Sequence, residues 1–258
     1  MHLNRLLVAA AVMASIGAGA TTAQAQGKVV VSHDEWLTDP SHFGSNEQQF
    51  ITNVNSFFGL AAGNSILIYS NDGFLTNAPF IAFLNSAGFT TTTSTSPGSF
   101  SGYNAVFTEG NPTMDATGLG LYVQGGGNVF DLGGTGVPDA AGEAAYSNPF
   151  LNMFGLGFAS VYNGLGTVNT SGYAAQGPFG ADLFTGVASV YANNGSDVIT
   201  ATDVPGVTNQ IFYDDAQNGT FAAAVVATPE PASLTLMATG LAGLAGFVKR
   251  RKKIVAAS

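Results

Sequence analysis

The sequence predicts an α/β fold: a mostly parallel sheet with helices on both faces, a β-rich C-terminal extension and one C-terminal transmembrane helix. Three observations favour it. Short β-branched runs alternate with helical patterns through the first two-thirds of the chain, and Gly and Asn turns separate them. The roughly 200 residues of 27–228 are enough for one domain with a sizeable core.

The predicted strands are short apolar or β-branched runs bounded by turn residues. Such runs suit strands that are buried on both faces of a parallel sheet. In order they are Val29–Val31, Ile66–Tyr69, Phe89–Thr95, Tyr103–Thr108 and Asn128–Leu132.

Helical spacing of apolar side chains predicts a helix after most of these strands. The first helix follows a capping-box pattern from Ser45 to Gln48. The second has Pro79 in its first turn and Gly88 as its C-cap, positions that suit both residue types. The predicted helices are 46–59, the segment from Pro79 to Gly88, 114–124 and 140–153.

From about residue 158 the pattern changes to short apolar runs between Gly and Asn turns. Such runs predict edge strands or a hairpin extension. They are Val187–Tyr191, Val198–Thr202, Gln210–Tyr213 and Phe221–Val226.

Charge is distributed unevenly along the chain. Residues 27–228 carry 15 acidic side chains and a single basic one, Lys28. Nucleic acids, phosphorylated substrates and anionic membranes all require clustered Lys and Arg, so the composition disfavours them as partners. The absence of Cys excludes disulfides, Cys-ligated metals and thiol nucleophiles. Cations and neutral polyols are the ligand classes left.

The N-terminal end is predicted to be a secretory signal peptide, residues 1–25. Arg5 precedes an apolar stretch, and Ala23 and Ala25 form an A-x-A cleavage site. The domain of residues 27–228 is therefore expected to be exported, with signal peptidase as a partner during export.

The C-terminal end, residues 229–258, has three parts. Pro229, Glu230 and Pro231 come first, the apolar run 232–248 follows, and the basic cluster 249–253 comes last. The apolar run is predicted to be a short transmembrane helix, with the basic cluster on the cytoplasmic side of the inner membrane.

This tail resembles the PEP-CTERM sorting signal of bacteria, which is sometimes labelled as the C-terminal domain of ice-binding proteins. The resemblance implies an exosortase that recognises the tail and cleaves near Pro229–Pro231. It also implies transient anchoring in the inner membrane and delivery to the cell surface or to an exopolysaccharide matrix.

Residues 64–160 resemble the glutamine-amidotransferase-like (flavodoxin-like) superfamily. The glycines 125–127 lead into the predicted strand 128–132, and Gly133 and Gly134 follow it. The family's nucleophile would fall near Leu132–Gly134, where the chain has no Cys, and no His occurs after His42. The resemblance therefore implies the fold without the catalysis.

Acidic residues lie at or just past the ends of four predicted strands: Asp34, Asp72, Glu109 and Asp131. Ligands of parallel sheets bind beyond the carboxyl ends of the strands, so these four are candidate ligands of one calcium or polyol site. The alternative is that the four acids cap helices or face water.

Two further sets of side chains are candidates. His33, Asp34, Glu35 and His42 could form a transition-metal site, and the alternative is a solvated polar loop. Several tyrosines near Gly and Asn turns could form a sugar-stacking surface, and the alternative is ordinary packing. They are Tyr146, Tyr162, Tyr173 and Tyr191.

Together these observations favour an exported, non-enzymatic protein of the cell surface or exopolysaccharide matrix, with calcium as its one candidate cofactor. The chain contains neither a phosphate-binding P-loop nor a G-x-S-x-G nucleophile turn. Two alternatives stay open: a calcium- or polysaccharide-binding module that uses the acidic strand ends, and a carboxylate-dependent hydrolase.

Overall fold

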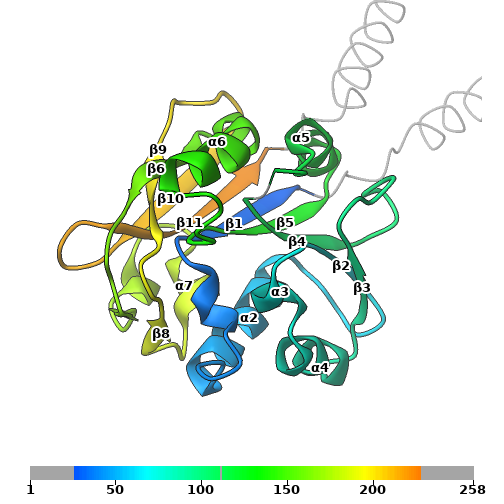
Figure 1. Cartoon of the computed structure of the whole chain (residues 1–258), viewed down its shortest axis with the longest axis horizontal. Coiled ribbons are helices and arrows are strands. Elements are labelled where there is room, and N and C mark those ends of the chain that lie inside the picture. Colours follow the sequence, from blue (N-terminus) through cyan, green and yellow to red (C-terminus); the bar gives the residue numbers. More distant parts are fainter. Residues whose placement is uncertain (1–25, 111, 228–258) are drawn as a thin grey trace, which may run out of the picture. The chain divides into compact units, whose positions relative to one another are not determined.

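The centre of the computed structural model, which describes residues 26–110 and 112–227, is a seven-stranded sheet of order β10-β11-β1-β5-β4-β2-β3 (Figure 1). β1, β5, β4, β2 and β3 run parallel, whereas β11 lies antiparallel between β1 and β10. A mostly parallel sheet in an α/β fold is thereby confirmed. The strands are β1 (Lys28–Ser32), β2 (Ser65–Tyr69), β3 (Thr90–Ser94), β4 (Ala105–Glu109), β5 (Asn128–Leu132), β10 (Val207–Tyr213) and β11 (Gly219–Val226).

The register of the parallel strands brings their carboxyl ends to one edge of the sheet. Ser32 of β1 pairs with Leu132 of β5, and Leu132 pairs with Glu109 of β4. Tyr69, the last residue of β2, pairs with Thr108. The loops that leave β1, β2, β4 and β5 therefore start side by side.

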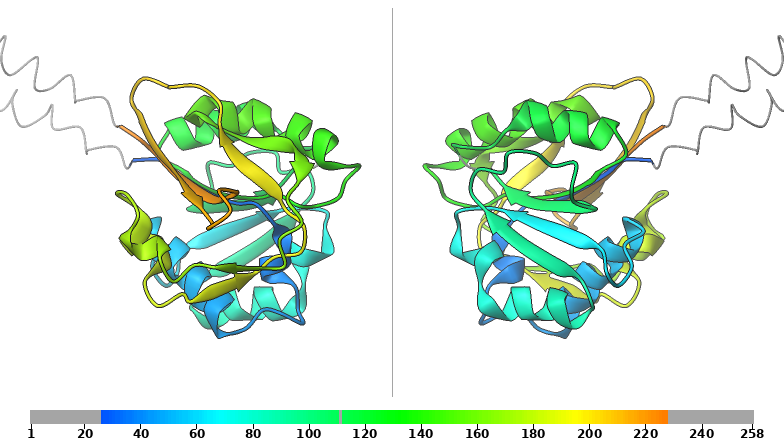
Figure 2. Two further views of the ribbon diagram at one scale, coloured as in Figure 1. Left: turned by 90° about the vertical axis from the view of Figure 1, so that its left-hand side faces the viewer. Right: turned by 90° about the vertical axis from the view of Figure 1, so that its right-hand side faces the viewer.

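Helices cover both faces of the sheet (Figure 2). Apolar side chains of α2, α4 and α7 pack in one core with Val30 of β1, whereas those of α5 and α6 pack in a second core with Val29 and Val31. This division follows from the alternation of side chains along a strand. The helices are α2 (Ser45–Phe57), α3 (Gly73–Thr76), α4 (Ala78–Ser86), α5 (Ala116–Gln124), α6 (Ala140–Leu151) and α7 (Gly180–Phe184).

The start of α2 differs from the predicted capping box. Gly44, not Ser45, is the N-cap residue, and the Glu47 carboxylate accepts a hydrogen bond of 3.0 Å from the Gly44 N–H. Glu47 suits this position because its charge also favours the positive end of the helix dipole. The helix consequently begins one residue earlier than predicted.

The C-terminal third forms the expected hairpin extension, β10–β11. Of these two strands, β10 lies at an edge of the sheet and β11 lies inside it. Four strands form two small antiparallel pairs outside the main sheet. The sequence pattern predicts β8 and β9 but not β6, β7 or α7. The pairs are β6 (Leu156–Tyr162) with β9 (Ser196–Thr200), and β7 (Thr167–Asn169) with β8 (Ser189–Tyr191).

Among residues 26–110 and 112–227, no helix is both long and apolar enough to span a bilayer. The predicted signal peptide and the predicted transmembrane helix 232–248 lie outside the described residues.

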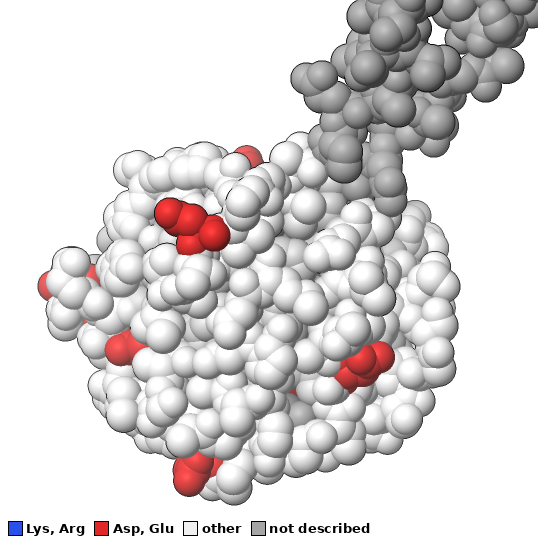
Figure 3. Space-filling model, turned by 90° about the horizontal axis from the view of Figure 1, so that it is seen from above, with Lys and Arg blue, Asp and Glu red and all other residues white. Residues whose placement is uncertain are grey.

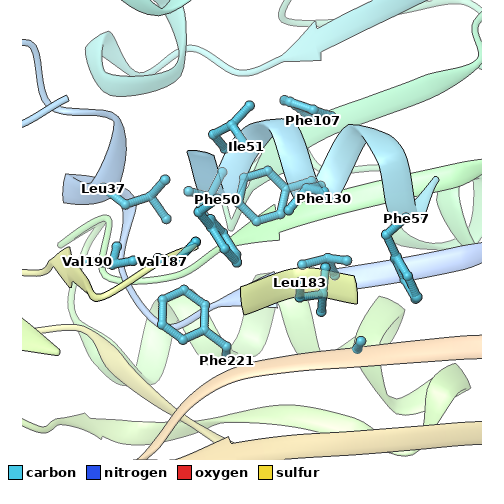
Figure 4. Close-up of a cluster of buried hydrophobic side chains, with 14 of the residues drawn as sticks. Leu37, Phe50, Ile51, Phe57, Phe107, Phe130, Leu183, Val187, Val190 and Phe221 are labelled. Atoms are coloured by element: carbon cyan, nitrogen blue, oxygen red, sulfur yellow. The ribbon is translucent and has the colours of Figure 1, made fainter. Parts of the chain in front are cut away.

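Phe50 of α2 is at the centre of the larger core (Figure 4). Its ring is fully buried, and its centroid lies 5.0 Å from that of Phe221 and 5.3 Å from that of Phe184. Phe130 of β5 completes the contact at 6.2 Å. Phe50 therefore joins α2, α7, β5 and β11.

We predict that Phe50→Ala lowers the free energy of unfolding by about 3–5 kcal/mol, because it removes buried apolar surface and leaves a cavity. Urea denaturation measures the change. The control is Leu121→Ala, which truncates a side chain that is 64% exposed and should change stability by less than about 0.5 kcal/mol. Equal effects of the two substitutions would contradict this packing.

Candidate metal centre

Three carboxylates meet at the carboxyl edge of the sheet: Glu35, Asp72 and Glu109, the carboxylate triad. One ligand oxygen of each lies within 4.8 Å of those of the other two. Calcium binds oxygen at about 2.3–2.6 Å, so two ligands of one ion lie at most about 5 Å apart. The spacing of the triad therefore suits a single cation.

Short turns after β1 and β2 position two members of the carboxylate triad. Glu35 is the first residue of the 3-10 helix η1 (Glu35–Thr38), whose N-cap Asp34 accepts a 2.8 Å hydrogen bond from the Trp36 N–H. Asp72 is the N-cap of α3 and accepts 2.7 Å from the Phe74 N–H. Both turns use Asp for the same reason, since its short side chain satisfies a free N–H at a helix start.

Glu109 connects the end of β4 to the turn after β2. It is the last residue of β4, and its Oε1 accepts hydrogen bonds from the Ser70 hydroxyl and, at 3.1 Å, from the Asp72 N–H. These hydrogen bonds connect the loop after β2 to the end of β4, and they place Asp72 beside Glu109.

Glu35 is the member whose environment points most directly to a ligand. Its side chain is 2% exposed, and its Oε2 has no hydrogen-bond partner among the described residues. Buried polar atoms in native proteins are nearly always paired, since an unpaired one costs desolvation energy. A cation within the triad would supply the missing partner.

Burial and the neighbouring carboxyl groups oppose ionisation of the two buried glutamates of the triad. Burial raises the pKa of Glu35 to about 10, and repulsion from the Asp72 and Glu109 carboxyls adds to the shift. Burial likewise raises the pKa of Glu109 to about 7, although the Ser70 hydroxyl opposes that shift. Without a cation, protons must neutralise part of this charge.

No basic side chain of the described residues compensates the triad. Lys28, the one Lys or Arg among them, starts β1 at the opposite edge of the sheet and donates to the Phe57 carbonyl. Figure 3 shows one face of the domain, on which acidic side chains form scattered groups and no Lys or Arg is visible.

The structure brings together two of the four carboxylates that the sequence suggested, Asp72 and Glu109. Asp34 is used as a cap: its Oδ2 also accepts 2.7 Å from the Asn193 N–H, and burial raises its pKa to about 6. Asp131 is fully buried, and burial, with repulsion from Glu143, raises its pKa well above the ordinary value. Neither belongs to the triad, and Glu35 is its third carboxylate instead.

Glu143 of α6, which the sequence analysis did not single out, holds the turn after β5. Its carboxylate accepts hydrogen bonds of 2.6 Å from the Gly134 N–H and 2.9 Å from the Thr135 N–H. Gly134 has a φ of +75°, and a Cβ there would lie 3.0 Å from Asp34. The Gly-Gly turn therefore serves as a close-packed backbone turn bound by a carboxylate.

The two histidines do not join a metal-ligand group among the described residues. His33 is buried, its Nδ1 accepts from the Asn163 amide at 3.1 Å, and desolvation lowers its pKa to about 3. His42 Nδ1 lies 2.8 Å from Asp39 Oδ1. His33 Nε2 has no hydrogen-bond partner among the described residues, whereas Asp39 holds His42 through Nδ1.

Of the four tyrosines suggested for sugar stacking, only Tyr191 belongs to a partly exposed aromatic group. Tyr173 is buried, with its hydroxyl 2.8 Å from Thr220 Oγ1. Tyr146 and Tyr162 make no ring contact among the described residues. The aromatic group, here named the ring cluster, consists of the partly exposed Trp36, His42, Phe74 and Tyr191.

A cavity of about 500 Å³ lies at the opposite, amino edge of the sheet. Its lining contains no charged side chain, and its polar groups are asparagines, tyrosines and a serine. It is therefore separate from the carboxylate triad.

Comparison with known proteins gives one match. The model of the PEP-CTERM protein-sorting motif matches residues 227–252. No curated protein and no solved structure matches the chain. The resemblance of residues 64–160 to the glutamine-amidotransferase-like superfamily thus has no support. The chain carries a PEP-CTERM sorting motif, which implies an exported protein recognised by an exosortase.

We predict that Glu35→Gln stabilises the cation-free protein at pH 8 and loses this advantage near pH 4. The pKa of Glu35 rises from about 4.5 in the unfolded chain to about 10 in the folded one. Its contribution to stability is therefore full below pH 4.5 and is lost as the pH rises toward 10. Thermal melts in EDTA at both pH values measure the difference.

The matched control for this experiment is Asp203→Asn, which removes one exposed carboxylate. Its melting temperature should follow that of the unmodified protein at both pH values. A Glu35→Gln advantage that is equal at pH 4 and pH 8 would refute the assignment.

Proposed function

We propose that the chain is an exosortase-sorted cell-surface or matrix protein whose exported domain, residues 27–228, binds one calcium ion at Glu35, Asp72 and Glu109. The observation that carries the proposal is the buried, unpaired Glu35 oxygen within a triad of suitable spacing. The role is binding rather than catalysis.

Calcium is the cation that suits the donor set best. All three donors are carboxylate oxygens, which are hard ligands, and neither Cys nor His joins them. Extracellular modules bind calcium with dissociation constants of about 10⁻⁴–10⁻³ M, and we expect this range for an exported domain.

Binding is favoured over hydrolysis by the burial of the carboxylates. Two members of the triad, Glu35 and Glu109, are buried, so they do not face solvent as an acid–base pair must do to reach a substrate. Neither histidine belongs to the carboxylate triad, and the chain has no Cys nucleophile. A carboxylate-dependent hydrolase is therefore the weaker candidate.

Sorting rests on the tail. The motif match at 227–252 supports recognition by an exosortase, with a transient inner-membrane anchor at 232–248. Such a route would deliver the domain to a compartment where calcium is available. The tail and the triad together support the function of an exported cation-binding surface protein.

We predict that the full-length protein, in a mild non-sugar detergent, sensitises terbium luminescence when its tryptophan is excited. Terbium replaces calcium at oxygen sites, and Trp36, the one tryptophan of the chain, is the neighbour of Glu35. Calcium should quench the emission by competition. Glu35→Gln should weaken terbium affinity by more than about tenfold, whereas Asp203→Asn should leave it unchanged.

Two results would contradict the cation site. One is the absence of sensitised emission from the unmodified protein. The other is equal terbium affinity of the Glu35→Gln variant and the Asp203→Asn control.

For the tail, we predict that deletion of residues 229–258 releases the protein into the culture medium. Fractionation of cells and medium, with an antibody against the domain, measures the distribution. Deletion of residues 254–258 alone is the control, because it leaves the motif and the basic cluster intact. Cell retention of the longer deletion would show that the tail does not anchor the protein.

A further inference from the structure

Two residues of the ring cluster, Trp36 and Phe74, and two carboxylates of the triad, Glu35 and Asp72, belong to the same two short helices or their caps. Trp36 follows Glu35 in η1, and the Phe74 N–H donates to Asp72 at the start of α3. The Trp36 ring centroid lies 5.0 Å from that of Phe74 and 6.1 Å from that of Tyr191. On each of the two helices, an aromatic residue of the ring cluster therefore lies within two residues of a candidate cation ligand.

The rings are held in place by their neighbours. The His42 ring stacks on Tyr191 with centroids 3.5 Å apart and planes within 3°, and its Nδ1 contacts Asp39. The Tyr191 N–H donates to Glu47 at 3.0 Å. A ring surface that is ordered before binding loses little conformational entropy when a ligand stacks on it.

A cation in the triad would have coordination positions to spare. Calcium takes 6–8 oxygens, and the triad supplies one from each of three residues. Glu35 and Glu109 are buried, whereas Asp72 is partly exposed. Solvent can therefore reach a bound cation from the Asp72 side, and Phe74 is the second residue of α3, the helix that Asp72 caps.

The charge of the domain limits what can fill those positions. With 15 acids and one base in residues 27–228, an anionic ligand would be repelled. A purely apolar ligand would provide no oxygen for the cation. The ligand that satisfies both surfaces is uncharged, carries adjacent hydroxyl oxygens and presents an apolar face to a ring.

We infer that the ring cluster and the triad-bound cation together bind a sugar ring of a neutral polysaccharide. Two vicinal hydroxyls of the sugar complete the coordination of the cation, and the C–H face of the same or the next sugar stacks on Trp36. This inference rests on the proposed cation site and adds the ligand class. It makes the exported domain a cation-dependent glycan-binding module.

The test measures retention of the full-length protein, in a non-sugar detergent, on beads that carry coupled mannan or dextran. We expect at least tenfold more protein on mannan or dextran beads with calcium than with EDTA, and background binding to uncoupled beads. Addition of the retained soluble polysaccharide should also change the emission of Trp36, the one tryptophan of the chain.

Variants separate stacking from cation binding. Trp36→Leu and Tyr191→Leu should lose retention while calcium still raises their melting temperatures, which shows that they fold and bind the ion. Asp203→Asn should behave as the unmodified protein.

Each other outcome decides against the inference in a distinct way. Terbium luminescence without retention on either polysaccharide would overturn the glycan site and leave the cation site standing. Retention that is equal in EDTA, or unchanged in both ring variants, would overturn the joint site. Absence of terbium luminescence would overturn the proposed cation site and this inference with it.

Discussion

Carboxyl groups without a basic partner are concentrated at the carboxyl edge of the parallel sheet, and their mutual repulsion is the main constraint on this site. Two like charges about 4 Å apart repel by about 4 kcal/mol at an effective dielectric constant of 20, and a whole domain is stable by only about 5–15 kcal/mol. Ionisation of the buried Glu35 and Glu109 is therefore opposed, both by burial and by the neighbouring carboxyl groups. Either protons or a cation must neutralise them.

Neutralisation by protons and neutralisation by a cation are favoured under different conditions. Protons serve where cations are scarce, at the cost of a folded state that weakens as the pH rises. A cation serves where its concentration is high, and it would join the turns after β1 and β2 to the end of β4. An exported protein moves from the first condition to the second, so the sorting tail and the triad are compatible parts of one molecule.

Much of this edge could be predicted from the sequence, because the strands that carry it are short apolar runs with clear ends. Asp72 and Glu109 follow directly from that pattern. Asp131 does not belong there because it comes one residue before the end of β5. It pairs with Val31, whose side chain faces the α6 side of the sheet, and strand alternation gives Asp131 the same face. The choice between Asp34 and Glu35 depends on a capping hydrogen bond, which no spacing rule distinguishes.

The C-terminal third was less predictable because its pairings join distant segments. β6 pairs with β9 across more than thirty intervening residues, from Leu156 to Thr200. The ring cluster likewise gathers side chains from three separate segments, and Tyr191 contributes to it as the last residue of β8. The local periodicity of a sequence contains no information about contacts between such distant segments.

The most direct test of the central claim is a crystal structure of the protein soaked with terbium, with the anomalous signal used to locate the ion. We expect one strong peak within about 2.3–2.6 Å of oxygens from Glu35, Asp72 and Glu109. A triad without a peak, with its carboxylates hydrogen-bonded to one another or to water, would contradict it.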